Sequence, residues 1–155
     1  MARDDFGGAT YREGALDRVG EAFILLESEH FAGSVYLAGR GVESMLRALI
    51  WKNDPDIQQG KKSLPTGHDL RKLLTLISNL GLRRKGERDE ELQSNVQKVG
   101  RLWFNNLRFM SSKSVERWWR EIGEVNSSRS LKKASREYYD ACSAIIKRCE
   151  VLWQR

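Results

Sequence analysis

Proline is scarce in this chain of 155 residues, which contains only Pro55 and Pro65. Outside the short segment that holds them, the chain lacks the strong turn and helix-breaking signals that proline provides. Leu, Ala, Glu, Lys and Arg dominate instead, and these residues favour helices. The composition therefore predicts an all-α protein.

Cysteine is equally scarce, since Cys142 and Cys149 are the only two. They fall on one predicted helix, about 10 Å apart along its axis, which is too far for a disulfide. Both are expected to be small buried residues of a reduced, cytoplasmic protein. The N-terminal MARDDFGGAT has no signal-peptide core, and no apolar run approaches the roughly 20 residues of a membrane span.

Histidine is rare too, with only His30 and His68. Two histidines and two cysteines without ligand spacing predict no metal site. The sequence also contains no P-loop, no dinucleotide fingerprint and no local nucleophile motif. Neither a metal nor a cofactor is expected.

The net charge of +6 is unevenly distributed. Residues 1–51 hold five basic and eight acidic residues, residues 52–88 hold nine and four, and residues 89–155 hold thirteen and nine. A basic excess confined to the last two thirds suits an anionic partner such as RNA or a nucleotide. A soluble protein with a Lys/Arg-rich surface explains it equally well.

The most strongly patterned stretch is Phe31–Trp51, FAGSVYLAGRGVESMLRALIW. At about 100° per residue, its apolar residues cover more than half of a helix. They include Phe31, Val35, Ala38, Val42, Met45, Leu46 and Leu49. The remaining polar stripe is narrow and consists of Arg40, Glu43, Ser44 and Arg47. Since a surface helix shows water a broader face, this helix is predicted to lie at the centre of a bundle.

The other helices are predicted from spacings of three and four residues and from capping residues. Residues 1–9 form a loose tail, and residues 10–155 form one domain with a linker at 54–66. Thr66 is expected to cap the third helix, with Asp69 completing a capping box. The predicted helices are 10–29, 31 to about 52–54, 66–81, 88–108, a short one within 111–127, and 129–153.

Three segments resemble the HEPN domain family. AGRGVESMLRALI (Ala38–Ile50) is similar to the family's second helix, an Ala- and Gly-containing run followed by Glu and then Leu-Lys/Arg-Ala-Leu. GHDLRKLL (Gly67–Leu74) resembles the His-Asp/Asn-Leu start of its third helix. WFNNLRFM (Trp103–Met110) resembles a Leu-Arg-aromatic element that closes the fourth helix in some members.

The resemblance implies an up-and-down bundle of four to five main helices plus a short one, often assembled as a homodimer. Active members of the family are metal-independent ribonucleases with an Arg, four to six residues and a His in the dimer cleft. Here the corresponding positions before His30 are Phe23, Ile24 and Leu25, and those before His68 are Lys61, Lys62 and Ser63. The catalytic motif is absent, so no catalytic residue is carried over.

Candidate binding residues lie on the polar stripe and near it. Arg40, Glu43 and Arg47 suit the ion pairs of an exposed helix face. Alternatively they line a groove, where Arg40 and Arg47 contact an anion or Glu43 pairs with an arginine from another helix such as Arg108, or they form a dimer contact. His68, in the predicted first turn of the third helix, is either a surface residue or a phosphate ligand at the helix start.

Basic and aromatic clusters offer further candidates for nucleic-acid contact. Lys61 and Lys62 lie in the linker, and the turn Arg83–Lys85 adds Arg83, Arg84 and Lys85. All are solvated cations or non-specific phosphate contacts. Trp118 and Trp119 are either a base-stacking pair or one core and one interface residue.

These observations predict a non-catalytic, HEPN-like helical binding module that binds RNA or a nucleotide. The resemblance places it in prokaryotic defence, toxin–antitoxin or regulatory systems, as a homodimer or with a nucleotidyltransferase-like or other toxin–antitoxin partner. Two alternatives stay open: a divergent metal-independent ribonuclease that uses Arg40, Arg47 or His68, and a purely structural bundle that binds a protein partner.

Overall fold

The computed structural model describes residues 6–81 and 89–155, which form helices and connecting segments only. The all-α prediction is confirmed. In order, the helices are α1 (Gly8–Glu27), α2 (Phe31–Asn53), α3 (Pro55–Gln58), α4 (Leu70–Asn79), α5 (Glu90–Leu102), the 3₁₀ helix η1 (Asn105–Phe109), α6 (Ser112–Glu121) and α7 (Leu131–Gln154).

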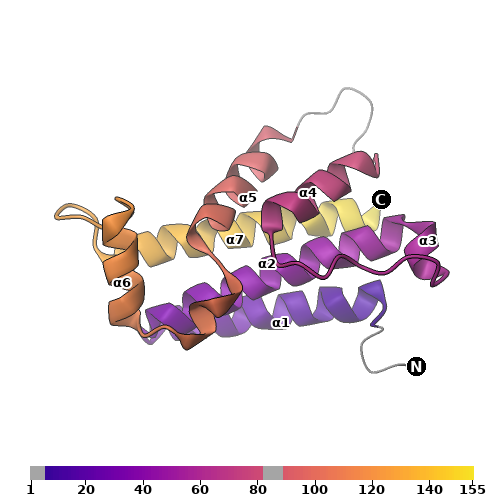
Figure 1. Cartoon of the computed structure of the whole chain (residues 1–155). Helices are drawn as coiled ribbons and strands as arrows, with labels where there is room; N and C mark the ends of the chain where they lie inside the picture. The colour runs from indigo at the N-terminus through magenta and orange to yellow at the C-terminus, as the bar shows by residue number, and fades with distance from the viewer. Residues whose placement is uncertain (1–5, 82–88) are drawn as a thin grey trace.

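Three long helices, α1, α2 and α7, lie side by side (Figure 1). Ion pairs at both ends fix their directions. Arg136 at the start of α7 pairs with Glu27 at the end of α1, and Arg12 near the start of α1 pairs with Glu150 near the end of α7. Thus α1 runs antiparallel to α7, and α2, which follows α1 after a three-residue break, runs parallel to α7.

The predicted central position of α2 is confirmed. The helix packs against α1, α3, α4, α6, α7 and η1. Its apolar side, including Ala38, Val42 and Leu49, is fully buried in the core. The shorter α4 and α5 cross this layer obliquely, and α6 stands across its end in Figure 1.

Two helix boundaries were predicted wrongly. Thr66 does not cap the third helix, because α4 begins at Leu70 and the Asp69 carboxylate accepts the N–H groups of Arg71 and Lys72. His68 therefore precedes the helix. The helix predicted to reach residue 108 ends at Leu102, and η1 follows after two extended residues.

The cysteines are buried, as predicted, and remain free thiols. Burial raises the pKa of both Cys142 and Cys149 to about 12, because removal from water disfavours the thiolate. Both thiols thus act as small apolar core groups. Among the described helices, none is long and apolar enough to cross a membrane.

Candidate functional site

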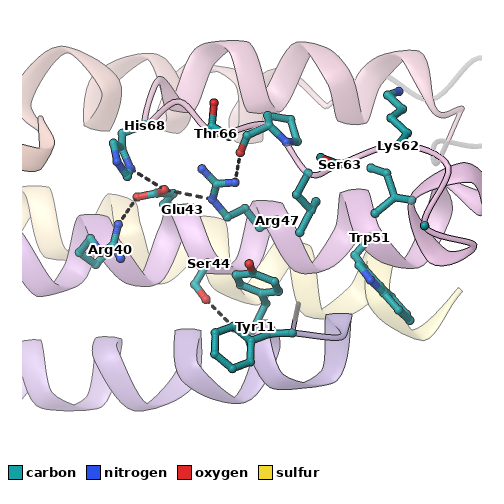
Figure 2. Close-up of a pocket in the computed structure, with 15 residues that line it drawn as sticks. Tyr11, Arg40, Glu43, Ser44, Arg47, Trp51, Lys62, Ser63, Thr66 and His68 are labelled. Atoms are coloured by element: carbon teal, nitrogen blue, oxygen red, sulfur yellow. Dashed lines mark hydrogen bonds and ion pairs between the residues drawn. The ribbon is translucent and has the colours of Figure 1, made fainter. Parts of the chain in front are cut away.

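The polar stripe of α2 lines a cavity of about 670 Å³. The connection between α3 and α4, residues 59–69, passes over this stripe and is called the strap below (Figure 2). Cationic and imidazole side chains in the lining come from α2 and the strap, and the aromatic ones come from α1, α2 and the residues before α1. The cationic and imidazole side chains are Arg40, Arg47, Lys62 and His68. The aromatic side chains are Phe6, Tyr11 and Trp51.

Glu43 is the central residue of this site, with a relative exposure of 2%. One carboxylate oxygen accepts a hydrogen bond from Arg40 Nη1 at 2.8 Å. The other lies 3.0 Å from Arg47 Nε and 2.8 Å from His68 Nδ1. A buried carboxylate is tolerated when charged partners and hydrogen bonds compensate for lost hydration, and Glu43 has both. The stripe is thus an ion-paired helix face and also the wall of a cavity.

Arg47 ties the strap to α2. Its Nη1 donates to the carbonyl of Pro65, and its Nη2 donates to the carbonyl of Gly67 at 2.7 Å. Since Nε already pairs with Glu43, the guanidinium is committed to the protein on all three nitrogens. Its planar fork suits such multidentate bonding. Arg47 therefore shapes the cavity, and its charge is balanced by that of Glu43.

The other end of the strap is held by Lys62, whose Nζ lies 3.1 Å from an Asp54 carboxylate oxygen. The Lys62 ammonium, helped by the backbone N–H groups of Ile57 and Asp56, lowers the pKa of Asp54 below its ordinary value. Asp54 also caps α3 through those N–H groups. The Lys62 side chain is 59% exposed and lines the cavity, so it has donors left for a ligand.

Aromatic rings complete the lining. Ser44 Oγ donates to the carbonyl of Tyr11 at 2.7 Å, which joins α1 to the polar stripe. Phe6 packs edge-on against the Tyr11 ring, with centroids 6.2 Å apart. In Figure 2, Tyr11 lies between the Arg40–His68 end of the cavity and the Trp51–Lys62 end.

The charges of this site nearly balance. Arg40, Arg47 and Lys62 face Glu43 and Asp54, so these five side chains carry one excess positive charge. Arg40, with a 38% exposed side chain, pairs only with Glu43 among the described residues. Arg40 and Lys62 therefore supply the free donors that attract an anion.

Four of the predicted binding residues come together here: Arg40, Glu43, Arg47 and His68, joined by Lys62. Arg108 does not pair with Glu43, because its guanidinium lies 4.7 Å from the centroid of Phe109. Lys61 is exposed outside the lining. The predicted contacts Arg83, Arg84 and Lys85 lie outside the described residues.

Sequence reasoning missed Tyr11, Trp51 and the strap carbonyls. Tyr11 and Trp51 belong to the apolar stripes of their helices, where spacing does not separate a core ring from one at a cavity wall. The only signal was their position near helix ends, next to the Gly- and Pro-containing segments 7–8 and 54–66. Backbone carbonyls leave no mark in a side-chain pattern.

Within the described ranges, no group of three or more His, Cys, Asp or Glu side chains is placed to hold a metal ion. Comparison with known proteins found no matching family model, no matching curated protein and no matching solved structure. The geometry of the cavity is therefore the basis for assigning a function.

Proposed function

We propose that this protein is a non-catalytic binding module whose α2 cavity holds a nucleoside phosphate, either free or at the end of an RNA strand. The observation that carries this proposal is the lining itself, which combines Arg40 and Lys62 with the rings of Tyr11 and Trp51. A volume of about 670 Å³ lies within the range of small-molecule sites.

Each part of such a ligand has a counterpart in the lining. A phosphate accepts charge-assisted hydrogen bonds from Arg40 or Lys62, whose donors are only partly used by the protein. A base stacks on an aromatic ring with little regard to its identity. Arg47 and Glu43 neutralise each other and hold the strap, so they preorganise the cavity without contacting the ligand.

The first prediction concerns the two cations. Arg40→Gln with Lys62→Gln is expected to weaken binding of adenosine monophosphate at least tenfold, because each lost charge-assisted bond is worth about 1.5–3 kcal/mol. Titration calorimetry measures the affinity. Adenosine, which lacks the phosphate, should bind weakly to both the unaltered protein and the variant. Comparing RNA with and without a terminal phosphate shows whether the cavity takes the end of a strand or only a free nucleotide.

Lys61→Gln is the matched control, because Lys61 adjoins Lys62 in sequence and has the same charge but lies outside the lining. It is expected to leave the affinity unchanged. Equal losses in the Lys61 and Lys62 variants would mean that only general charge matters. Absence of nucleotide binding by the unaltered protein would contradict the proposal and favour a purely structural, partner-binding bundle.

One observation supports a second candidate, metal-independent RNA cleavage. His68 Nδ1 lies 2.8 Å from the Glu43 carboxylate, and a histidine held in this way has Nε2 available for proton transfer. Arg40 lies on the same carboxylate, where it would stabilise phosphate charge. The carboxylate is shared with two arginines, which weakens its hold on the imidazole.

This candidate predicts cleavage of single-stranded RNA in the presence of a chelator, reduced at least a hundredfold by His68→Ala, since general acid–base groups contribute about 10²–10⁴-fold. Gel analysis of labelled RNA measures the rate. His30→Ala is the control, because His30 is exposed at the start of α2, away from the lining. Cleavage that survives His68→Ala would remove His68 from the chemistry.

The HEPN resemblance supports three further proposals: a homodimer, a cytoplasmic location, and a setting in prokaryotic defence, toxin–antitoxin or regulatory systems. A nucleotidyltransferase-like protein or another toxin–antitoxin component is the corresponding partner. Light scattering tests the dimer through the particle mass, which is 17.9 kDa for one chain.

A further inference from the structure

A group of aromatic rings projects from the segment that joins α5 to α6 and from α6 itself. Phe109, the last residue of η1, is 76% exposed, and Phe104 is 41% exposed. Trp118 is half-buried, and its ring meets that of Phe104 edge-to-face with centroids 5.1 Å apart. We call these rings, together with Arg108, Lys113 and Arg117, the 104–118 surface.

Phe104 and Phe109 are exposed and take no part in the core, and Trp118 packs only against its edge. The neighbouring Trp119 fills the core instead, since it is fully buried and packs against Tyr138 with centroids 5.8 Å apart. Helix α6 thus turns one tryptophan inward and the other toward Phe104. Large apolar rings exposed together are uncommon unless they bind something.

The charge around the rings is positive. Residues 104–121 contain four basic and two acidic residues. Of these, Arg120 pairs with Glu116 at 3.0 Å. Arg108, Lys113 and Arg117 form no ion pair with any residue in the described ranges, and the Arg108 Cζ atom lies over the Phe109 ring, 4.7 Å from its centroid. A polyanion suits this combination.

The surface lies on the same side of α2 as the cavity. Just before it, Trp103 Nε1 donates to the carbonyl of Tyr36 at 3.1 Å, so the chain crosses α2 at that level. The strap crosses α2 at Arg47, eleven residues after Tyr36. Eleven residues are close to three full turns and about 16 Å, so Tyr36 and Arg47 share one face of α2.

We propose that the 104–118 surface binds single-stranded nucleic acid. Unpaired bases stack on Phe104, Phe109 and Trp118, and the arginine planes extend the stack. Arg108, Lys113 and Arg117 neutralise the phosphates. A duplex buries the faces of its bases, so it cannot use the rings. This proposal does not depend on ligand binding in the α2 cavity.

The test is fluorescence anisotropy with a labelled oligouridylate of about 12 nucleotides that carries no terminal phosphate. Phe109→Ala is expected to weaken binding about tenfold, since stacking is worth about 1–3 kcal/mol per base. Log affinity falls as log salt concentration rises, and Arg108→Gln with Arg117→Gln should make this negative slope shallower by about 1.4. Phe23→Ala, which removes a 44% exposed ring on α1, should have no effect.

Three outcomes would overturn the proposal: no binding of the oligouridylate at low salt, equal binding by the Phe109→Ala variant, or displacement by polyglutamate at equal charge. The last would identify an acidic protein as the partner. Phe109→Ala should keep its affinity for adenosine monophosphate, because Phe109 does not line the α2 cavity. Failure of the cavity to bind nucleotide therefore remains distinguishable from failure of this surface.

Discussion

Replacement of Glu43 by alanine is expected to lower the free energy of unfolding by about 3 kcal/mol, because it leaves the buried Arg47 guanidinium without its counterion. Arg47 is 9% exposed, and Glu43 is its only acidic partner among the described residues. For a chain of this size the loss corresponds to a fall of roughly 10 °C in Tm. Thermal unfolding followed by circular dichroism measures it.

Glu116→Ala is the matched control. Glu116 and Arg120 form the same kind of pair, one helical turn apart, but their side chains are 41% and 56% exposed. Exposed pairs contribute about 0–1 kcal/mol, so Tm should change by a few degrees at most. Similar losses in the two variants would show that the Glu43 pairs add no more than surface pairs.

A double replacement separates the charge from the packing. Glu43→Leu with Arg47→Met removes the buried pair together and leaves no unpaired buried charge, because Arg40, the other arginine on Glu43, is 38% exposed. The double variant should therefore recover part of the loss. It should not recover all of it, because Arg47 also binds the carbonyls of Pro65 and Gly67. The remaining deficit measures how strongly the strap depends on Arg47.

The central helix could be predicted because every residue from Phe31 to Trp51 follows one periodic pattern, and that pattern needs only the geometry of an α-helix. The same reasoning identified Arg40, Glu43 and Arg47 as one stripe. The prediction that His68 lies near that stripe depended only on the HEPN resemblance, which the comparisons with known proteins do not test. In the structure, His68 reaches Glu43 because the strap, fixed by Arg47, carries it there.

The errors arose where tertiary contacts override local preference. Leu92, Val96, Val99, Trp103 and Leu107 have helical spacing, yet α5 ends at Leu102 and Trp103 is extended with φ −126° and ψ 137°. This conformation lets the indole pack on Gly39 and bind the Tyr36 carbonyl. Similarly, Thr66 and Asp69 are both good capping residues, and the contacts of the strap decide between them.

The contact of Trp103 with Gly39 leaves no room for a side chain at position 39. A Cβ atom on Gly39 would lie 2.2 Å from Trp103 Cδ1 and 2.4 Å from Cγ. These atoms belong to the part of the buried Trp103 side chain that lies nearest the backbone. The clash can therefore be relieved only if the backbone at Trp103 moves, with loss of the hydrogen bond to the Tyr36 carbonyl. Overpacking costs about 1–3 kcal/mol and the lost bond about 1 kcal/mol, while helix propensity returns about 1 kcal/mol.

Gly39→Ala is therefore expected to destabilise the protein by about 1–3 kcal/mol, measured by urea unfolding. Gly20→Ala is the control with the opposite sign, since a Cβ there meets no atom within 4 Å and better helix propensity should stabilise the chain by up to about 1 kcal/mol. If both variants gained stability, Trp103 would not be held on α2. Because Phe104 follows Trp103 directly, Gly39→Ala should also weaken oligouridylate binding, whereas Gly20→Ala should not.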